Sequence, residues 1–231
     1  MARLPRLVVA GQAHHVLLRG HNAQPVFVDD EDRRLYLQAL QDAARAHAVQ
    51  VHAYALLGHE VQLLLRPGSE AALSRTMQAL GRRYGAQFNR RHGRSGTLWE
   101  GRFRAGVVQA GTPVLHCLLL IDTLLPRHGL AASPQTAGWC SAPHRLGLRR
   151  DPLVVDPEEF WRLGNTPFER EAAYAALLAQ GLGEAERRHI EHAAANGWAL
   201  GSAEFLAEVA AQRGRAVRPR ARGRPRRASG A

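Results

Sequence analysis

Residues 49–65, VQVHAYALLGHEVQLLL, indicate a β-hairpin. Residues 49–57 and 60–65 have the pattern of two strands, and Gly58 with His59 between them forms a tight turn. Pro67 and Gly68 then end the second strand. The sequence therefore predicts an antiparallel strand pair in the first third of the chain.

A strand and a helix are predicted before this hairpin. Residues 14–19 form a short strand, which Gly20 ends. Residues 29–32 then place four acidic side chains in the first turn of a helix, where the helix dipole favours negative charge. Leu37, Leu40 and Ala44 continue this helix along one face.

The clearest helix follows the hairpin. Its apolar side chains recur at steps of three and four residues and so share one face: Leu73, Met77, Leu80, Tyr84 and Phe88. Its arginines fall on the opposite face: Arg75, Arg82, Arg83 and Arg90. A strand at residues 102–110 comes next, and then a third helix that begins at Thr112 and Pro113 and is expected to stop at Pro126.

This order of elements predicts an α+β fold. A small antiparallel sheet with helices on one face fits it, and a ferredoxin-like sheet is the simplest such architecture. Further helices are predicted after residue 130, one of them with a capping box at residues 166–169. We divide the chain into a sheet domain at 1–130, a loop and helical extension at 131–212, and a tail at 213–231.

Charge distinguishes the tail from the rest of the chain. The protein has 231 residues and a formal net charge of +11, and every one of its 31 basic residues is Arg. Eight arginines and no acid lie in residues 213–231, so the tail is predicted to be disordered when free. Because the planar guanidinium can donate two hydrogen bonds to one phosphate, nucleic acid is the first partner to consider.

The remaining composition excludes several classes of protein. Cys117 and Cys140 are too few for a disulfide framework or a four-thiolate zinc site. No apolar run is long enough to span a bilayer, and residues 1–11 lack the features of a secretory signal. We expect a cytoplasmic, nucleoid-associated protein without a membrane partner. The sequence leaves its oligomeric state open.

Several strings stand out along the chain, among them GQAHHV (11–16), GRRY (81–84), GTLWEGR (96–102) and GWALGS (197–202). These strings resemble those of the IS200-like tyrosine transposases, most closely their REP-associated branch. The resemblance runs through most of the chain in order, and GTLWEGR is its most specific string. It implies a ferredoxin-like nuclease fold, DNA transposition, and the cutting and rejoining of single-stranded DNA beside hairpins.

The chain departs from the family pattern where the chemistry is done. The resemblance implies a divalent metal held by two histidines one residue apart on a strand, but those positions are Glu60 and Gln62 here. It also implies a tyrosine nucleophile on the third helix, and that position is Leu120. A leucine has no nucleophilic atom. We therefore expect a pseudoenzyme that binds DNA without cleaving it by the family mechanism.

Two alternatives stay open. Glu60 and Gln62 share a strand face and offer oxygen ligands, so a rebuilt site for Mg²⁺ or Mn²⁺ would allow an active transposase or endonuclease that uses a water nucleophile. Solvated polar side chains are the simpler interpretation, and with them no cofactor is expected. The chain could also be a folded remnant without a function.

The predicted DNA contacts are mostly arginines. In the folded part they are Arg75, Arg82, Arg83, Arg90, Arg94, Arg102 and Arg104. Trp99 and Phe103 either stack on bases or belong to the core. The tail string RGRPRR resembles the core of an AT-hook, which would place Arg222, Arg224, Arg226 and Arg227 in the minor groove of AT-rich duplex. Nonspecific adhesion of the tail to nucleic acid is the alternative. The expected partner is single-stranded or hairpin DNA, with duplex as a second partner of the tail.

Overall fold

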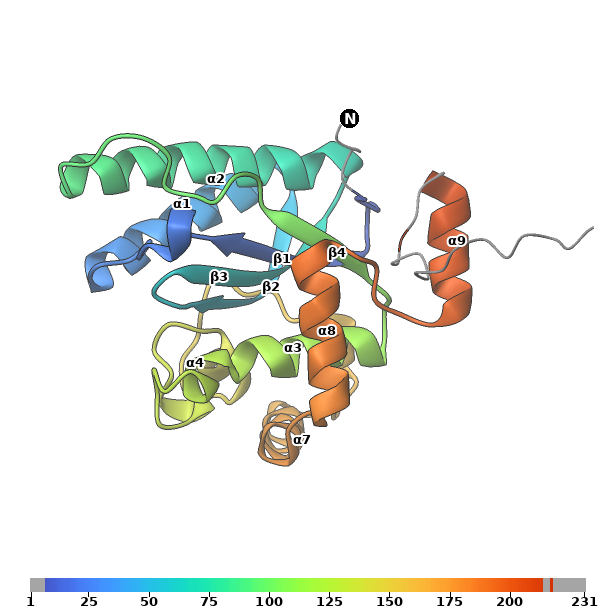
Figure 1. Ribbon diagram of the computed structural model, residues 1–231. Coiled ribbons are helices and arrows are strands. Elements are labelled where there is room, and N and C mark those ends of the chain that lie inside the picture. Colours follow the sequence, from blue (N-terminus) through green and yellow to red (C-terminus); the bar gives the residue numbers. More distant parts are fainter. Residues whose placement is uncertain (1–6, 214–216, 218–231) are drawn as a thin grey trace, which may run out of the picture.

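The computed structural model describes residues 7–213 and 217. Its centre is a four-stranded sheet (Figure 1) made of β1 (Ala13–Arg19), β2 (Val49–Leu56), β3 (Glu60–Pro67) and β4 (Arg104–Val108). The strands are ordered β2-β3-β1-β4, and each neighbouring pair is antiparallel. Each crossover helix connects strands that are separated by one other strand. This is the ferredoxin-like arrangement, so the predicted α+β fold is confirmed.

The two long helices α1 (Asp30–Ala46) and α2 (Glu70–Arg91) lie together on one face of the sheet (Figure 1). Helix α1 begins where Asp29 accepts a hydrogen bond of 2.9 Å from the backbone N–H of Asp32. All five apolar residues of the predicted α2 stripe are buried. They form the first hydrophobic core together with α1 and the inner faces of β2 and β3.

The third helix does not join this layer. Helix α3 (Thr112–Asp122) and the short turn α4 (Leu124–Arg127) cover the opposite face of the sheet (Figure 1). The expectation that all helices share one face is corrected here: the two crossover helices do, and α3 does not. The physical reason is that every residue of α3 from 117 to 122 is buried, so the helix needs partners on more than one side. Pro126 lies inside α4, whereas α3 already ends at Asp122, so the predicted stop was also wrong.

The helical extension supplies those partners. Its elements are η2 (Pro134–Thr136), α5 (Ala142–Arg145), α6 (Glu158–Trp161), α7 (Pro167–Gln180) and α8 (Glu184–Asn196). The capping box at Thr166 and Glu169 is present at the start of α7. Apolar residues of α3, α7 and α8 form the second core with the outer face of the sheet. The extension and the sheet domain therefore share one hydrophobic core.

A buried ion pair joins α3 to the extension. The side chains of Asp122 and Arg145 are both fully buried, with 2.7 Å between the carboxylate Oδ2 and the guanidinium Nη1. The same carboxylate accepts hydrogen bonds from the hydroxyls of Ser141 (2.6 Å) and Tyr174 (2.7 Å). Arg145 also donates to the backbone carbonyl of His52 on β2. The ion pair and its hydrogen bonds thus connect four segments: β2, α3, residues 141–145 and α7.

Two short elements and the chain ends complete the fold. The turn η1 (His21–Ala23) follows β1, and α9 (Ala203–Arg213) forms a third, small core with Leu7, Val107 and Val217. Among the described residues, no helix is long and apolar enough to cross a membrane. The AT-hook-like string at 222–227 lies outside the described residues.

Candidate nucleic-acid interface

The two positions that the resemblance assigns to metal ligands are occupied by a closed polar network. Strand alternation places Val61 and Leu63 in the first core, so Glu60 and Gln62 face the opposite side, toward α3 and α8. The register pairs Arg19 of β1 directly with Glu60 of β3. Arg19 Nε donates to Glu60 Oε2 at 2.7 Å, and Gln62 Nε2 donates to Glu60 Oε1 at 2.7 Å. Both carboxylate oxygens of Glu60 are therefore engaged.

His15 extends this network from β1. Its Nε2 lies 2.8 Å from Gln62 Oε1, and burial lowers the pKa of the imidazole below its ordinary value. The neutral imidazole therefore donates from Nε2 to the amide oxygen. A metal ion at Glu60 and Gln62 would have to displace Arg19 and break two hydrogen bonds. The residues present do not fit a metal well. Across residues 7–213 and 217, no three His, Cys, Asp or Glu side chains are grouped so that they could hold an ion.

The nucleophile position is equally unsuited to the chemistry. Leu120 is fully buried in the second core, between the sheet and the extension. Its neighbour on the same helix, Cys117, is also fully buried, and burial raises the pKa of its thiol. A thiol in this environment stays protonated and is not a nucleophile. Neither side chain brings a reactive atom to the surface.

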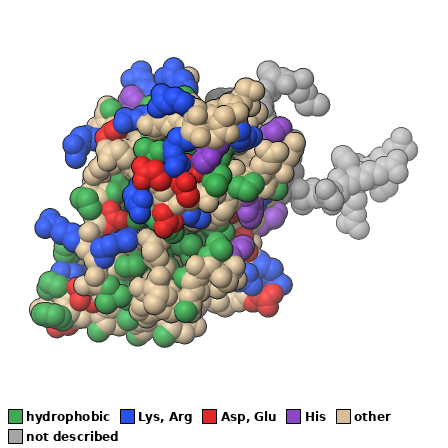
Figure 2. All heavy atoms as spheres, turned by 90° about the vertical axis from the view of Figure 1, so that its left-hand side faces the viewer, with side chains coloured by type: hydrophobic (Ala, Val, Ile, Leu, Met, Phe, Trp, Pro, Cys, Tyr) green, Lys and Arg blue, Asp and Glu red, His purple; other side chains and the backbone are tan. Residues whose placement is uncertain are grey.

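The arginines of α2 occupy the predicted outer face. Arg75, Arg82 and Arg90 are exposed, and within the described part of the chain no hydrogen bond or ion pair holds them. Arg83 instead forms an ion pair with Asp42 of α1 at 2.7 Å. Figure 2 shows basic side chains along the upper edge of the molecule, over the α1 and α2 layer. Three of the four predicted contacts on this helix are therefore open to an anionic partner.

The other three arginines differ from one another. Arg102 is exposed. Arg94 donates to the side-chain oxygen of Gln24 at 2.9 Å and stacks over Phe88. Arg104 donates to the backbone carbonyl of Ala195 in α8. Arg94 and Arg104 thus have structural roles of their own, and Arg102 belongs with the open arginines.

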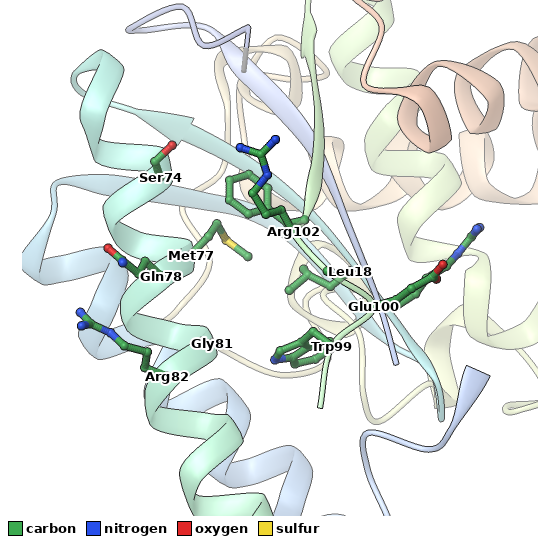
Figure 3. Close-up of a pocket in the computed structure, with 12 residues that line it drawn as sticks. Leu18, Ser74, Met77, Gln78, Gly81, Arg82, Trp99, Glu100 and Arg102 are labelled. Carbon is green, nitrogen blue, oxygen red and sulfur yellow. The ribbon is translucent and has the colours of Figure 1, made fainter. Parts of the chain in front are cut away.

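A groove of about 490 Å³ lies between α2 and the segment 99–103 (Figure 3). Its apolar walls are formed by Leu18, Met77, Trp99 and Phe103. Figure 3 shows Met77 pointing into the groove from α2, opposite Trp99. The specific string GTLWEGR therefore provides one wall of this groove. Gly101, whose φ is 65°, allows the sharp change of direction within it.

Trp99 belongs to the groove and to the core at once. Its ring centroid lies 6.1 Å from that of Tyr36 and 6.2 Å from that of Tyr84. Tyr84 in turn is held by a hydrogen bond from its hydroxyl to the carbonyl of Val26. The indole is thus fixed by core aromatics on one side while its other side lines the groove. The interpretation of Trp99 as a core residue therefore agrees with its packing, and its stacking on bases stays a prediction.

Charged and polar side chains surround the apolar walls. Arg82 and Gln78 line the groove from α2, with the ends of their side chains directed away from Trp99, whereas Glu100 and Arg102 lie on the opposing segment (Figure 3). The groove thus combines an aromatic wall with one open arginine on each side. Such a combination suits the flat bases and the phosphates of a nucleic-acid strand.

Three residues of this region were missed by sequence reasoning. Arg19 appeared only as the end of a strand, Met77 only as a core residue, and Gly81 only as part of a family string. A glycine in the middle of a strong helix is a local signal, because it lowers helix stability without a local reason. It would not have been enough to mark the groove, since Gly85 gives the same signal and does not line it. Gly81 lies on the side of α2 that faces Trp99 (Figure 3).

Comparison with known proteins identifies the fold. No protein-family model matches the sequence, and no curated protein matches it. The solved structure of the REP-associated tyrosine transposase bound to a REP hairpin is similar, with a TM-score of 0.53 and 14% sequence identity. That similarity covers 69% of this chain and 93% of the other. A crystal structure from Deinococcus radiodurans R1, provisionally named a transposase, has 21% identity and a TM-score of 0.36 over 47% of this chain and 88% of its own. The chain therefore has the fold of a REP-associated tyrosine transposase.

Proposed function

We propose that this protein is a DNA-binding member of the IS200-like, REP-associated tyrosine transposase family and that it has lost the family's cleavage chemistry. The observation that carries the proposal is the row of open arginines on α2 beside an aromatic groove. The shared fold supports it, since the similar transposase structure holds a REP hairpin. The family strings, above all GTLWEGR, support it further.

The spacing of the arginines fits an extended phosphate backbone better than a single anion. Arg75, Arg82 and Arg90 are separated by seven and eight residues, which corresponds to roughly 10 and 12 Å along a helix axis. Three guanidinium groups in a row over roughly 20 Å can each contact a different phosphate of one strand. We therefore expect affinity to depend steeply on salt, because each neutralised phosphate releases counterions.

The loss of cleavage follows from the two altered positions. The family step needs a tyrosine oxygen that attacks phosphorus and becomes linked to one DNA end while the other end leaves. Leu120 offers only carbon, and its side chain is buried. The carboxylate of Glu60 is neutralised by Arg19, so a metal ion finds little free charge there. Both observations favour binding without cutting.

Binding is tested by fluorescence anisotropy with a labelled DNA hairpin that carries a single-stranded flank. The triple variant Arg75→Gln/Arg82→Gln/Arg90→Gln should lower the slope of log Kd against log salt by about two. The control triple Arg162→Gln/Arg187→Gln/Arg188→Gln changes the net charge equally but lies on α8 and just after α6, on the opposite layer. An equal loss of slope in both variants would refute a specific role for the α2 face.

Cleavage is tested on the same hairpins with Mg²⁺ or Mn²⁺. We expect neither a cut strand nor a covalent adduct between DNA and protein. Cut products that disappear in Glu60→Ala would overturn this part of the proposal and establish the alternative, a nuclease with a rebuilt oxygen-ligand site. A chain that ends at Val217 separates the folded part from the tail, whose contribution we expect to be strongest on AT-rich duplex.

A further inference from the structure

We infer that Arg45 and Arg66 form a second phosphate site, at the end of the sheet where α1 ends and α2 begins, and that this site takes a backbone phosphate of duplex DNA. The inference rests on the proposed DNA binding and names a contact that lies beyond the arginine row of α2. Both side chains are exposed, and they line one open cavity of about 530 Å³. Its other lining residues come from the start of β1, the end of α1 and the open end of the β2–β3 hairpin.

The backbone, and not a carboxylate, orients Arg66. Its Nε donates to the carbonyl of Gly11 at 2.7 Å. The N–H of Gly11 in turn donates to the carbonyl of Pro67 at the end of β3, at 2.8 Å. One side of the guanidinium is thereby fixed, and its two Nη groups keep their N–H donors for a ligand. Because the guanidinium is already oriented, less side-chain entropy is lost when an anion binds to it.

The acidic residues beside Arg66 are engaged elsewhere. Glu158 and Glu159 line a smaller cavity of about 130 Å³ that Arg66 also lines. Glu158 forms its ion pair with Arg162 at 2.6 Å, and Glu159 accepts a hydrogen bond of 2.6 Å from the backbone N–H of Gly111. Within the part of the chain that the structure describes, neither carboxylate forms an ion pair with Arg66. Its charge is therefore available to a ligand.

Arg45 stands in the last turn of α1 and is equally available. Among the residues that the structure describes, no hydrogen bond or ion pair holds its side chain. Asp42, one turn earlier on the same helix, forms its ion pair with Arg83 of α2 at 2.7 Å. The cavity thus has two guanidinium groups that no carboxylate neutralises, which suits a phosphate group.

The lining of the cavity suits a sugar–phosphate backbone better than a base. Much of it consists of small residues, namely Gly11, Ala44, Ala48 and Gly68, which leave room for a bulky ligand at the surface. None of the described residues that line it is aromatic, so no ring is present on which a base could stack. The amide of Gln50, which also lines the cavity, can donate to a phosphate oxygen.

The position of the site favours a duplex. Gly68 lines the cavity and Glu70 begins α2, which crosses the upper part of the molecule from there (Figure 1). Arg90 lies twenty residues after Glu70, or roughly 30 Å along the helix axis. This distance is close to one turn of B-DNA, roughly 34 Å. A duplex holds phosphates this far apart at fixed spacing, whereas a flexible strand must be ordered to make both contacts.

The test removes the two charges and leaves α2 unchanged. Arg45→Gln/Arg66→Gln should weaken the binding of a blunt duplex of about twelve base pairs by about threefold to tenfold. It should also lower the slope of log Kd against log salt by about one, since one phosphate contact is lost. The control Arg150→Gln/Arg188→Gln removes the same charge from exposed arginines of the extension and should change the affinity by less than about twofold.

A shorter duplex separates the two contacts. A duplex of about six base pairs cannot reach from the middle of the α2 row to the new site, so the double variant should bind it as tightly as the unaltered protein does. The gain in affinity from the short to the long duplex should therefore be smaller in the double variant than in the unaltered protein and in the control. Melting temperatures confirm folding. If the change at Arg66 unfolds the chain, Arg45→Gln alone gives the same comparison.

Three results would overturn the site. The first is a double variant that binds the long duplex as tightly as the unaltered protein does, and the second is an equal loss in the control. The third is that inorganic phosphate at constant ionic strength raises the melting temperature of the unaltered protein but not of the double variant, while both bind the long duplex equally. A free anion would then be the ligand.

Failure of the proposed function gives a different result. If the unaltered protein binds the hairpin with a single-stranded flank but neither duplex, the second phosphate site is wrong and the proposed function stands. If it binds none of these DNAs, the proposed function itself is wrong.

Discussion

Removal of Arg145 is expected to destabilise this protein more than any surface change. Arg145→Met keeps the length and the apolar stem of the side chain but deletes the guanidinium. The carboxylate of Asp122 would then remain buried with only two hydroxyl donors, from Ser141 and Tyr174, and no opposite charge within hydrogen-bond distance. The carbonyl of His52 would lose its donor as well.

The magnitude follows from this geometry. Removing one partner of a fully buried ion pair costs about 3–5 kcal/mol, because the other charge is left uncompensated. For a chain of this size, a loss of 1 kcal/mol lowers the melting temperature by about 2–4 °C. Arg145→Met should therefore lower it by roughly 6–20 °C. Asp122→Asn combined with Arg145→Met should cost clearly less than the sum of the two single changes, since the buried charge at position 122 is then removed together with its partner.

Urea unfolding followed by far-UV circular dichroism measures these losses as a change in midpoint at constant slope. Arg162→Met is the matched control, because Arg162 forms an ion pair of 2.6 Å with Glu158 while both side chains are about 70% exposed. Its removal should cost less than about 1 kcal/mol. The reasoning would be refuted if Arg145→Met cost no more stability than Arg162→Met. It would also be refuted if the loss in the Asp122→Asn/Arg145→Met double variant equalled the sum of the two single losses.

Two further predictions concern the dependence of stability on pH. Hydrogen bonds from Arg91 and from the backbone N–H of Asp32 lower the pKa of Asp29 from 3.8 to about 2. The stability that this carboxylate contributes is complete above pH 4 and is lost as the pH falls toward 2. Arg91→Gln should therefore make the midpoint of urea unfolding depend less on pH over that range. A pH profile equal to that of the unaltered protein would contradict this. Burial lowers the pKa of His15 below the ordinary 6.5. Below pH 6.5 the imidazole is therefore protonated in the unfolded chain while it stays neutral in the folded chain, so the stability of the fold decreases as the pH falls. His15→Gln should reduce that decrease but not abolish it, because burial lowers the pKa of His52 as well; a decrease as steep as in the unaltered protein would show that His15 does not cause it.

The candidate interface was only partly predictable. The α2 arginines could be placed on one face because helical periodicity depends on sequence spacing alone. That Arg83 is held by Asp42, and Arg104 by the carbonyl of Ala195, depends on how α2 packs against α1 and β4 against α8. Pairing between distant segments has no local signal. The groove has the same origin, since its two walls come from α2 and from a segment twenty residues later.

The order of strands and helices, the apolar stripe of α2 and the absence of a nucleophile at Leu120 follow from residue types and their spacing, because these properties are local. The position of α3, the closed network around Glu60 and the buried pair of Asp122 and Arg145 do not. Each depends on a contact between segments that only the folded chain brings together: the register of β1 against β3 sets Arg19 opposite Glu60, and the extension covers α3. Long-range packing therefore decides that Glu60 and Gln62 belong to a network in which Arg19 neutralises the carboxylate. It also decides that the apolar helix α3 lies at the centre of a second core.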